Sequence, residues 1–514
     1  MSTLRRRAVL AALATGLVSG TVWATGWPGN RPRGSRATAG APPVPAPAPD
    51  ARLRMATASD AWKMGTAGTR PSNDKRLDIT GYASATSVNV GERIDFHVSV
   101  ANAGQFQVDI YRMGAYGTST AGLATSSPPL NGIRQAMPVP QPVSGTISCD
   151  WPAAWGLTIP QDWVSGHYLA VLTTVTGWRS YVPFVVREDG RRAQLCVVVP
   201  TTTYQAYNLW PKDNRKGKSL YYGYALTAAT ATAPATRQLD PTARAVEVSF
   251  DRPYNNAGMA SNMELDWTFA TWAEEAGYDL VFVTSQDLHA GRVDPTRYAA
   301  LVFPGHDEYW SREMRRYATA AVTAGTSLVF LSANNVYWHV RMPETADGRA
   351  GRLLTCYKGR PDEPADRAER TRRWREDPGP GDPEQRLLGV QFNGIPRGAA
   401  PLVVRGQDHW FWAGTGVRDG DSIADVVAGE ADGVGPEQVE GRQVLLSASP
   451  YVTTGGETMT QNTSLVETSS GALVFAAASL FWPRFLAPQG DPRIRRATAN
   501  VLDRVVARGR TPRP

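Results

Sequence analysis

The sequence predicts an all-β domain followed by an α/β domain, and two patterns of apolar residues support this fold class. Within residues 77–190, short segments alternate polar and apolar side chains, which is typical of strands with one buried face. From residue 191 onward, strands made of continuous apolar residues alternate with helices, which is typical of a parallel sheet covered on both faces. The chain of 514 residues is long enough for two or three domains with sizeable cores.

The first domain, residues 77–190, is expected to be a β-sandwich of the immunoglobulin-like type. Its clearest strands are separated by Gly and Pro turns, and none shows the periodicity of a helix. These strands are predicted at residues 93–100, 107–111, 168–172 and 181–186.

The second domain, residues 191–507, is expected to hold the parallel sheet. Ser261 and Glu264 form a capping-box pattern that predicts a helix start, and Gly277 supplies a left-handed stop for that helix. A return to strand and loop signals over residues 385–460 indicates a β-rich insertion. The remaining elements are predicted strands at 195–199, 279–284, 299–303, 327–332 and 473–477, and predicted helices at 311–324 and 491–507.

The N-terminal residues 1–25 have the pattern of a twin-arginine signal peptide. Two consecutive arginines precede an apolar segment of 16 residues, 8–23, so we expect export and a secreted or extracytoplasmic location. The alternative is a retained membrane anchor, because 16 residues are just short of a bilayer span. Residues 26–76 are expected to be a linker rich in Pro and Ala, and the stretch 26–56 should be sensitive to proteases.

The positive net charge is confined to the N-terminal segment. The whole chain carries a formal charge of +7, and residues 1–55 contain eight arginines and one acidic residue. The remaining residues contain 46 basic and 46 acidic side chains, so no basic surface for nucleic acid is predicted.

Three cysteines without a Cys-x-x-Cys pair predict neither a disulfide framework nor a zinc knuckle. Cys196, in an apolar strand, is expected to be a buried, inert thiol.

Two polar segments follow strands of the predicted parallel sheet, at the edge where such sheets bind their ligands. The first segment contains Asp287 and His289, and the second, residues 305–310, contains His306 and Glu308. We expect catalytic residues among these four side chains. The alternative for each of them is a structural role, in which the side chain braces its own turn.

The second segment resembles the large (beta) subunit of N,N-dimethylformamidase and its relatives. The similar stretch is residues 298–310, which contains a His-x-Glu-Tyr turn, and the resemblance extends over about 77–505. Residues 111–117, 409–416 and 429–432 support it. The resemblance implies a class I glutamine amidotransferase-like fold for the α/β domain and hydrolysis of a C–N amide bond.

The resemblance also implies a mononuclear ferric ion, Fe(III), held by two tyrosines and one glutamate. Such an ion prefers anionic oxygen donors, polarises an amide carbonyl and acidifies a bound water. Carried onto this chain, the implied ligands are Tyr309, a second tyrosine at Tyr278 or Tyr254, and Glu369. Glu430, in a Gly-x-Glu-x-Asp-like stretch, or the histidine of the His-x-Glu-Tyr turn would then handle protons.

The function predicted from the sequence is therefore an exported, dimethylformamidase-like hydrolase of a C–N amide bond. The alternative is a non-catalytic extracytoplasmic protein that binds glycan or cell wall. In that case the aromatic residues of 204–222 would line a groove, although they could equally anchor a loop. A thiol nucleophile is excluded, because residues 331–335 contain no cysteine at the position where amidotransferases carry one.

The expected partners are a small-molecule amide or a glycan. Neither nucleic acid nor a membrane is expected, unless the signal segment remains as an anchor. Self-association into a homo-oligomer is compatible with the sequence.

Overall fold

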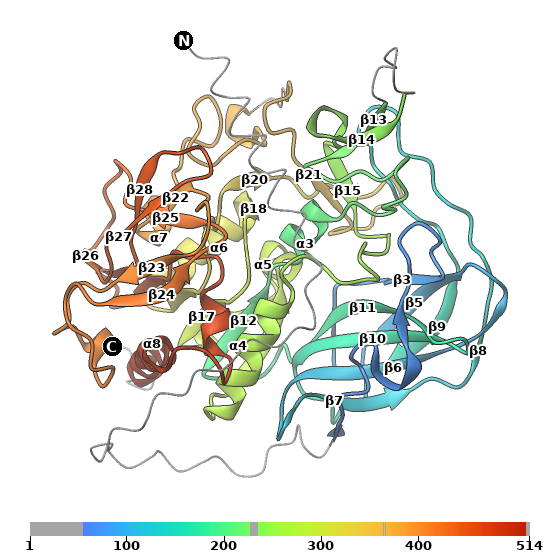
Figure 1. The fold of residues 1–514 in the computed structure, drawn as a ribbon, viewed down its shortest axis with the longest axis horizontal. Helices are drawn as coiled ribbons and strands as arrows, with labels where there is room; N and C mark the ends of the chain where they lie inside the picture. The colour runs from blue at the N-terminus through green and yellow to red at the C-terminus, as the bar shows by residue number, and fades with distance from the viewer. Residues whose placement is uncertain (1–54, 227–234, 363, 365, 510–514) are drawn as a thin grey trace.

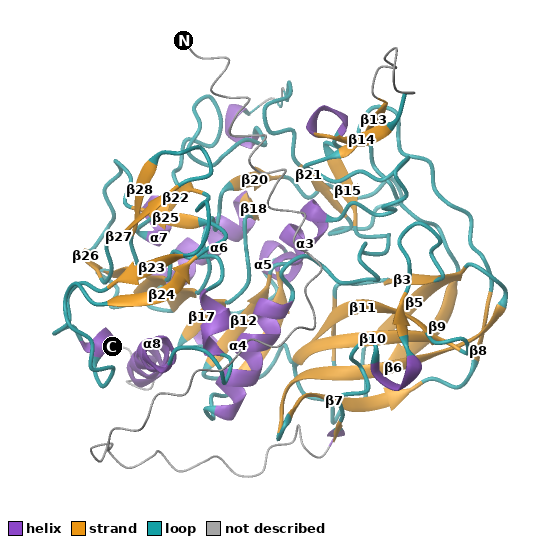
Figure 2. Ribbon diagram, in the orientation of Figure 1, coloured by secondary structure: helices purple, strands orange, loops and turns teal. Residues whose placement is uncertain are grey.

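The computed structural model of the chain is shown in Figure 1. It describes residues 55–226, 235–362, 364 and 366–509. The predicted signal segment 1–25 lies outside the described residues, as do residues 26–54 of the predicted linker. Strands outnumber helices, and most helices gather around one of the two large sheets (Figure 2). Within the described residues, no helix combines the length and the apolar composition needed to cross a bilayer.

Two sheets, one of eight strands and one of three, form the N-terminal part of the molecule, on the right of Figure 1. The strands of the larger sheet lie in the order β1 (Thr57–Ala58), β7 (Ser119–Ser126), β6 (Gly104–Tyr116), β10 (Gly166–Thr174), β11 (Trp178–Arg187) and β2 (Arg70–Pro71), with β4 (Ser87–Asn89) beside β11 and β8 (Leu130–Gly132) beside β6. The smaller sheet contains β3 (Ile79–Ala83), β5 (Arg93–Val100) and β9 (Ala153–Thr158). All four strands predicted for this region are present. Its immunoglobulin-like type stays a prediction.

The larger sheet is buried on both faces, because alternate residues of its strands enter two different cores. In β10, Ala170 and Leu172 pack with residues of the smaller sheet, whereas Leu169 and Val171 join a core that continues into the α/β part. The short strands β1 and β2 extend this sheet. The described end of the predicted linker 26–76 is thus paired with the sheet.

A seven-stranded sheet forms the centre of the α/β part. Its order is β16 (Leu280–Thr284), β12 (Leu195–Val199), β17 (Ala300–Phe303), β19 (Ser327–Phe330), β30 (Leu473–Ala476), β29 (Ser464–Glu467) and β26 (Arg442–Leu445). The first five strands are parallel, and the last two are added in antiparallel fashion. Helices α4 (Glu264–Glu275) and α8 (Pro492–Gly509) pack on one face, and α5 (Ser285–His289), α6 (Arg312–Thr323) and α7 (Gln385–Leu388) pack on the other. The predicted parallel strands and their coverage on both faces are therefore present.

The order of the parallel strands reverses at one point of this sheet. β12 is the first of them in the sequence, yet it lies between the second, β16, and the third, β17, so the direction of winding reverses between β12 and β17. Loops leave this point in opposite directions, and ligands of open α/β sheets bind there, outside the carboxyl ends of the strands. β12 leads into α3 (Thr201–Tyr207), and β17 leads into the His-x-Glu-Tyr turn.

The remaining strands form two-stranded sheets. They pair β13 (Gly223–Leu226) with β14 (Arg237–Asp240), β15 (Glu247–Ser249) with β21 (Leu353–Thr355), β18 (Tyr309–Ser311) with β20 (Trp338–Val340), β22 (Gln391–Gly394) with β25 (Ala431–Gly433), β23 (Ala400–Val403) with β24 (Ser422–Val427), and β27 (Ser449–Val452) with β28 (Thr458–Gln461). Single 3-10 turns occur at Thr66–Gly68, Pro241–Ala243, Pro295–Arg297, Arg367–Glu369, Trp410–Trp412 and Trp482–Leu486. The predicted insertion 385–460 is rich in strands, and its strand β26 joins the main sheet as an edge.

One predicted helix start is wrong. The capping-box pattern placed it at Ser261, but α4 begins at Glu264 and its N-cap, Met263, makes no side-chain capping bond. Asn262 has a φ of 60°, which is the left-handed region and cannot continue a right-handed helix. The predicted stop at Gly277, whose φ is 85°, is confirmed.

Candidate functional site

The turn after β17 lies at the carboxyl ends of β12 and β17, where the strand order reverses. Its backbone is fixed from α3, because the Thr203 hydroxyl accepts a hydrogen bond from the Glu308 N–H at 2.9 Å. Gly305 lies at a close approach, where a Cβ atom would come within 2.7 Å of an Asp266 carboxylate oxygen. A larger residue at Gly305 would displace the turn that carries His306 and Glu308.

Two tyrosine hydroxyls meet the carboxylate of Glu308. The Tyr221 hydroxyl donates to Glu308 Oε1 at 2.6 Å, and the Tyr207 hydroxyl lies 2.8 Å from Glu308 Oε2. The two hydroxyls are 3.1 Å apart, and their rings are stacked with centroids 4.5 Å apart. Tyr207 is the last residue of α3, whereas Tyr221 precedes β13. We call Tyr207, Tyr221 and Glu308 the tyrosine–glutamate cluster.

A histidine joins this cluster to a second carboxylate. His306 Nε2 lies 3.4 Å from Glu308 Oε2 and 3.5 Å from Glu430 Oε2. Its other ring nitrogen, Nδ1, lies 3.2 Å from the Ala333 carbonyl oxygen, which orients the ring. Asn334, after β19, donates from Nδ2 to Glu308 Oε1 at 3.3 Å.

The two carboxyl groups beside His306 have pKa values shifted in opposite directions. Burial raises the pKa of Glu430 to about 7, and the nearby Glu308 charge adds to this rise. The pKa of Glu308 is lowered, because hydrogen bonding and charge from His306 outweigh its burial. Burial would lower the pKa of His306, but the carboxylates of Glu430 and Glu308 raise it to about 9. The site therefore contains an ionised carboxylate, an imidazolium and a carboxyl group that can gain or lose a proton near neutral pH.

A buried lysine lies over the aromatic side of the cluster. Lys358 Nζ is 3.3 Å from the centroid of the Tyr221 ring, 4.6 Å from that of Trp338 and 5.3 Å from that of Tyr309. Burial lowers the pKa of Lys358 to about 7. An amine of this kind can donate a hydrogen bond to a ligand that binds beside the cluster.

Tyr309 contributes a ring to this region, but its hydroxyl does not join the carboxylate. The ring is fully buried and meets those of Tyr207 and Tyr221 at centroid distances of 6.4 and 6.1 Å. Its hydroxyl has no hydrogen-bond partner among the described residues.

The other two residues implied as metal ligands lie elsewhere. The Tyr278 hydroxyl donates to Asp503 Oδ1, on α8, at 2.7 Å. Glu369 accepts a hydrogen bond from Arg312 at 2.5 Å. The structure thus brings neither of them to Glu308.

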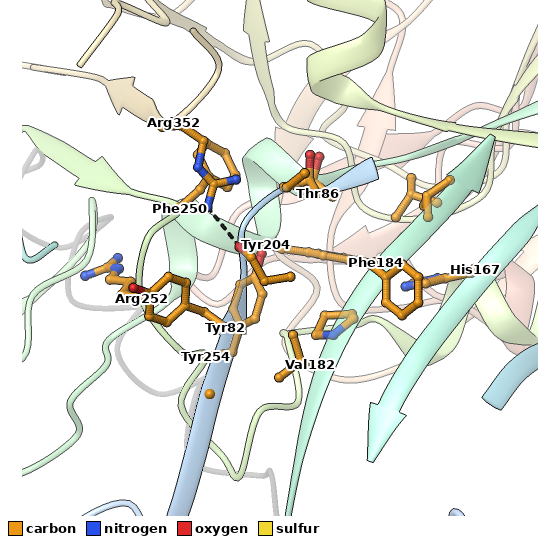
Figure 3. A pocket seen from close by; sticks show the side chains of 17 residues that line it. Tyr82, Thr86, His167, Val182, Phe184, Tyr204, Phe250, Arg252, Tyr254 and Arg352 are labelled. Carbon is orange, nitrogen blue, oxygen red and sulfur yellow. Dashed lines mark hydrogen bonds between the residues drawn. The ribbon is translucent and has the colours of Figure 1, made fainter. Parts of the chain in front are cut away.

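The second candidate for the second tyrosine, Tyr254, lines a different cavity. This cavity lies between β3, β11 and α3, and Figure 3 shows Tyr254 there beside Tyr82 and Tyr204. Its volume of about 30 Å³ is enough for one or two water molecules and too small for an organic substrate.

The segment with Asp287 and His289 has local structural contacts. Asp287 caps α5 by accepting from the Thr284 N–H at 2.8 Å, and it also accepts from the Ser87 hydroxyl at 2.8 Å. His289 Nδ1 lies 2.8 Å from the Ser311 hydroxyl and 3.2 Å from Glu313 Oε2. Of the five predicted catalytic residues, His306, Glu308 and Glu430 come together, whereas Asp287 and His289 do not join them.

Comparison with known proteins places the chain in a family. A family model described as N,N-dimethylformamidase beta subunit-like, C-terminal, matches residues 107–495, which is more than half of the chain. The chain belongs to this dimethylformamidase-like family. The match begins within β6 and ends within α8, so it includes every residue of the tyrosine–glutamate cluster together with His306 and Glu430.

Other comparisons add no further information on this member of the family. A search of curated proteins gives no significant match. Among solved structures, a Paenibacillus sp. cycloisomaltooligosaccharide glucanotransferase complexed with cycloisomaltoheptaose aligns with 8% identity and a TM-score of 0.15. The alignment covers 63% of this chain and 61% of that chain, so it spans less than two thirds of the glucanotransferase. A score this low supports no argument about fold or function.

Sequence reasoning did not single out Tyr207, Tyr221, Asn334 and Lys358 as functional residues. The two tyrosines lie in the aromatic segment 204–222, for which the sequence favours a groove and a loop anchor equally. Asn334 could have been found, because it follows the carboxyl end of a predicted parallel strand. No comparable signal marks Lys358, which lies in a loop after β21.

Proposed function

We propose that this dimethylformamidase-like protein hydrolyses the C–N bond of a small amide. The observation that carries the proposal is the convergence of Tyr207, Tyr221 and Glu308 at the strand-order reversal of the sheet, with His306 and Glu430 beside them. Family membership supports the same reaction class. Two carboxyl groups with oppositely shifted pKa values around one buried histidine are an arrangement that is frequent at functional sites.

The tyrosine–glutamate cluster fits the ferric ion that the family resemblance implies. It offers two phenol oxygens and one carboxylate, which are hard donors, and the pairs given above are 2.6 to 3.1 Å apart. Oxygen ligands held at roughly 2.0–2.2 Å from one ion lie at comparable separations from each other. We therefore propose Tyr207, Tyr221 and Glu308 as the ligands, in place of the set Tyr309, Tyr278 and Glu369. When bound, the ion would polarise the amide carbonyl and make a water more acidic.

The residues around the cluster suit the proton transfers of amide hydrolysis. In our proposal Glu430 accepts a proton as water attacks the amide carbon, and it returns that proton to the nitrogen as the C–N bond breaks. The products are a carboxylic acid and an amine. In the same proposal His306, which lies 3.5 Å from Glu430, holds this carboxyl group in position, and Lys358 and Asn334 orient the amide.

The proposal also includes export and a class I glutamine amidotransferase-like α/β fold. The twin-arginine pattern of residues 1–25 supports export, and the five parallel strands between two helical layers are compatible with that fold. Fractionation of the native host, with N-terminal sequencing of the mature chain, tests export. Full-length protein found only in the cytoplasm would contradict it.

The decisive experiment combines iron content with amide hydrolysis. Protein from iron-replete cells should contain about one iron per chain and release amine from members of a panel of small amides. Tyr207→Phe, Tyr221→Phe and Glu308→Gln should each lower iron affinity at least about tenfold and remove activity. Tyr278→Phe is the matched control, because it also removes a buried tyrosine hydroxyl but leaves the cluster intact.

Two results would overturn this assignment. Stoichiometric iron in both Tyr207→Phe and Tyr221→Phe would exclude the proposed ligands, and loss of iron in Tyr278→Phe alone would favour the ligand set implied by the sequence. Iron-free, inactive protein that binds cell-wall glycan would favour the non-catalytic alternative.

A further inference from the structure

A second cavity lies at the far edge of the seven-stranded sheet. It has a volume of about 160 Å³ and is lined by residues of β26, β29 and β30, by His409 and Trp410, and by the C-terminal half of α8. Figure 1 shows α8 and β26 on the left of the molecule, away from α3 and β18 near the tyrosine–glutamate cluster. None of the residues of the cluster lines this cavity.

The floor of the cavity is apolar. Val444 and Leu465 are directly opposite each other on β26 and β29, and Leu473 contributes from β30. Their side chains continue the core face of the sheet, where Leu465 and Leu473 are buried. Trp410 forms a wall and is partly buried against the same core. The volume is similar to that of cavities that accept one benzene ring, about 150 Å³.

The rim of the cavity is positively charged. Arg442, Arg504 and Arg508 line it together with a single carboxylate, Glu467. Glu467 is already shared, because Arg442 lies 2.9 Å from its Oε2 and Arg508 lies 2.5 Å from its Oε1. Three guanidinium groups against one carboxylate leave two positive charges in excess.

Arg504 supplies a guanidinium group that no carboxylate of the described residues neutralises. It makes no ion pair or hydrogen bond with any described residue, and its guanidinium carbon lies 5.5 Å from the centroid of the Trp410 ring. His409 lies on the same rim. Burial and the positive charges of Arg442 and Arg504 lower the pKa of its imidazole. His409 therefore stays neutral and adds no charge at neutral pH.

We propose that this cavity is a second ligand site, which binds a small carboxylate with an apolar body the size of one ring. The apolar part occupies the floor formed by Val444, Leu465 and Leu473 and lies against Trp410. The carboxylate pairs with Arg504 and Arg442, since a guanidinium group matches the geometry of a carboxylate through two parallel hydrogen bonds. A bare inorganic anion would leave the apolar floor in contact with water, so the floor selects an amphipathic ligand. This proposal does not depend on the proposed hydrolase function.

Calorimetric titration of the full-length protein with benzoate at low ionic strength tests the site. Wild-type protein should bind one benzoate with a dissociation constant of roughly 1 mM or below, as expected for a ligand of this size. Arg504→Gln should weaken binding at least about tenfold, because it removes the uncompensated charge. Arg496→Gln is the matched control, since Arg496 is also exposed on α8 but does not line the cavity. Benzyl alcohol, which has the ring without the charge, should bind at least about tenfold more weakly than benzoate.

A second set of measurements separates this cavity from the tyrosine–glutamate cluster. Trp410→Leu should weaken benzoate binding without loss of the folded state, which its melting curve checks. Tyr221→Phe should leave benzoate binding unchanged, and loss of binding in that variant would place the ligand in the cluster and overturn the proposal. Full affinity in Arg504→Gln, no binding up to about 10 mM benzoate, or binding of phenyl phosphate but not of benzoate would overturn it as well.

Discussion

Glu308 and Glu430 show how two identical side chains acquire different properties from their surroundings. Both are almost fully buried and both lie next to His306. Glu308 also receives hydrogen bonds from tyrosine hydroxyls and from Asn334, which stabilise its ionised form, whereas Glu430 has fewer such donors. Paired groups whose pKa values are pushed apart in this way are the usual acid–base sets of enzymes. This is why we assign binding to Glu308 and proton transfer to Glu430.

The assignment of Glu430 predicts a specific defect in one variant. Glu430→Gln should lower kcat for amide hydrolysis by about 10²- to 10⁴-fold, because a positioned acid–base group is removed. Iron content should stay the same, since the proposed ligands are untouched. Initial rates and elemental analysis measure the two effects. Glu457→Gln, an exposed substitution in the same β-rich region, is the control. Undiminished turnover in Glu430→Gln would remove Glu430 from the reaction.

At the scale of single elements, a histidine is buried in its neutral form where β10 packs against α4. His167, on β10, is 2% exposed, and its Nδ1 accepts a hydrogen bond from Trp267 Nε1 at 3.1 Å. Burial lowers the pKa of His167 to about 3. The unfolded chain, with a histidine pKa near 6.5, therefore binds a proton that the folded chain rejects. The free energy of unfolding is therefore not reduced by His167 above about pH 6.5, and it falls progressively as the pH decreases from 6.5 toward 3.

The shifted pKa of His167 predicts that the stability of the wild-type protein depends more strongly on pH than that of His167→Gln. Glutamine keeps an acceptor for Trp267 but does not titrate. Between pH 6 and pH 4, the free energy of unfolding of the wild type should fall by about 2–3 kcal/mol more than that of the variant. Urea unfolding at pH 7, 6, 5 and 4 gives both curves, and groups common to the two proteins cancel in the difference. Parallel curves would show that His167 is protonated in the folded state or exposed.

At the scale of the whole molecule, the N-terminal sheets and the α/β part share a continuous core. Leu169 and Val171 of β10 belong to the same apolar cluster as Phe269 of α4 and Val197 of β12. A buried ion pair crosses the same boundary, where Arg112 of β6 lies 2.7 Å from Glu274 of α4. Because Glu274 also accepts from the Ala115 N–H at 2.9 Å, its carboxylate ties a strand of the first part to a helix of the second.

Loss of the Arg112–Glu274 ion pair is expected to lower the stability of the protein. Glu274→Gln should cost about 3–5 kcal/mol of unfolding free energy, because it leaves the buried Arg112 charge uncompensated. Glu275→Gln, its exposed neighbour, should change stability by less than about 0.5 kcal/mol. Denaturant unfolding followed by both fluorescence and far-UV circular dichroism measures the two values. Equal stability of both variants would show that the pair contributes nothing to the joining of the two parts.

Local patterns in the sequence were sufficient for the five parallel strands of the seven-stranded sheet, for four strands of the N-terminal sheets and for the helices α4, α6 and α8. The alternation in 93–100 and the apolar run in 195–199 correspond to β5 and β12, since the burial of one face or of both faces leaves its own periodicity. The capping-box pattern at Ser261 failed, because the left-handed backbone of Asn262 overrides a local preference for helix. Local signals therefore predict an element more reliably than the residue at which it begins.

The sequence identified one part of the candidate site, and only the structure identified the rest. The His-x-Glu-Tyr turn was recognisable, because its residues are adjacent in the chain and follow a strand. The partners of Glu308 were not, because Tyr207 and Tyr221 are 101 and 87 residues away and carry no motif of fixed spacing. The resemblance led instead to Tyr278 and Glu369, which form hydrogen bonds with Asp503 and Arg312, away from Glu308.

The sequence by itself determined the parallel strands of the second part, the helices α4, α6 and α8, the family, and the turn that holds His306 and Glu308. Only the tertiary structure decided which tyrosines face that turn, that Glu430 shares its histidine, and that three arginines surround an apolar cavity at the opposite edge of the sheet. The physical reason is that periodicity and capping act within a few residues. The meeting of distant side chains depends instead on strand order and register, which are set when the whole core packs.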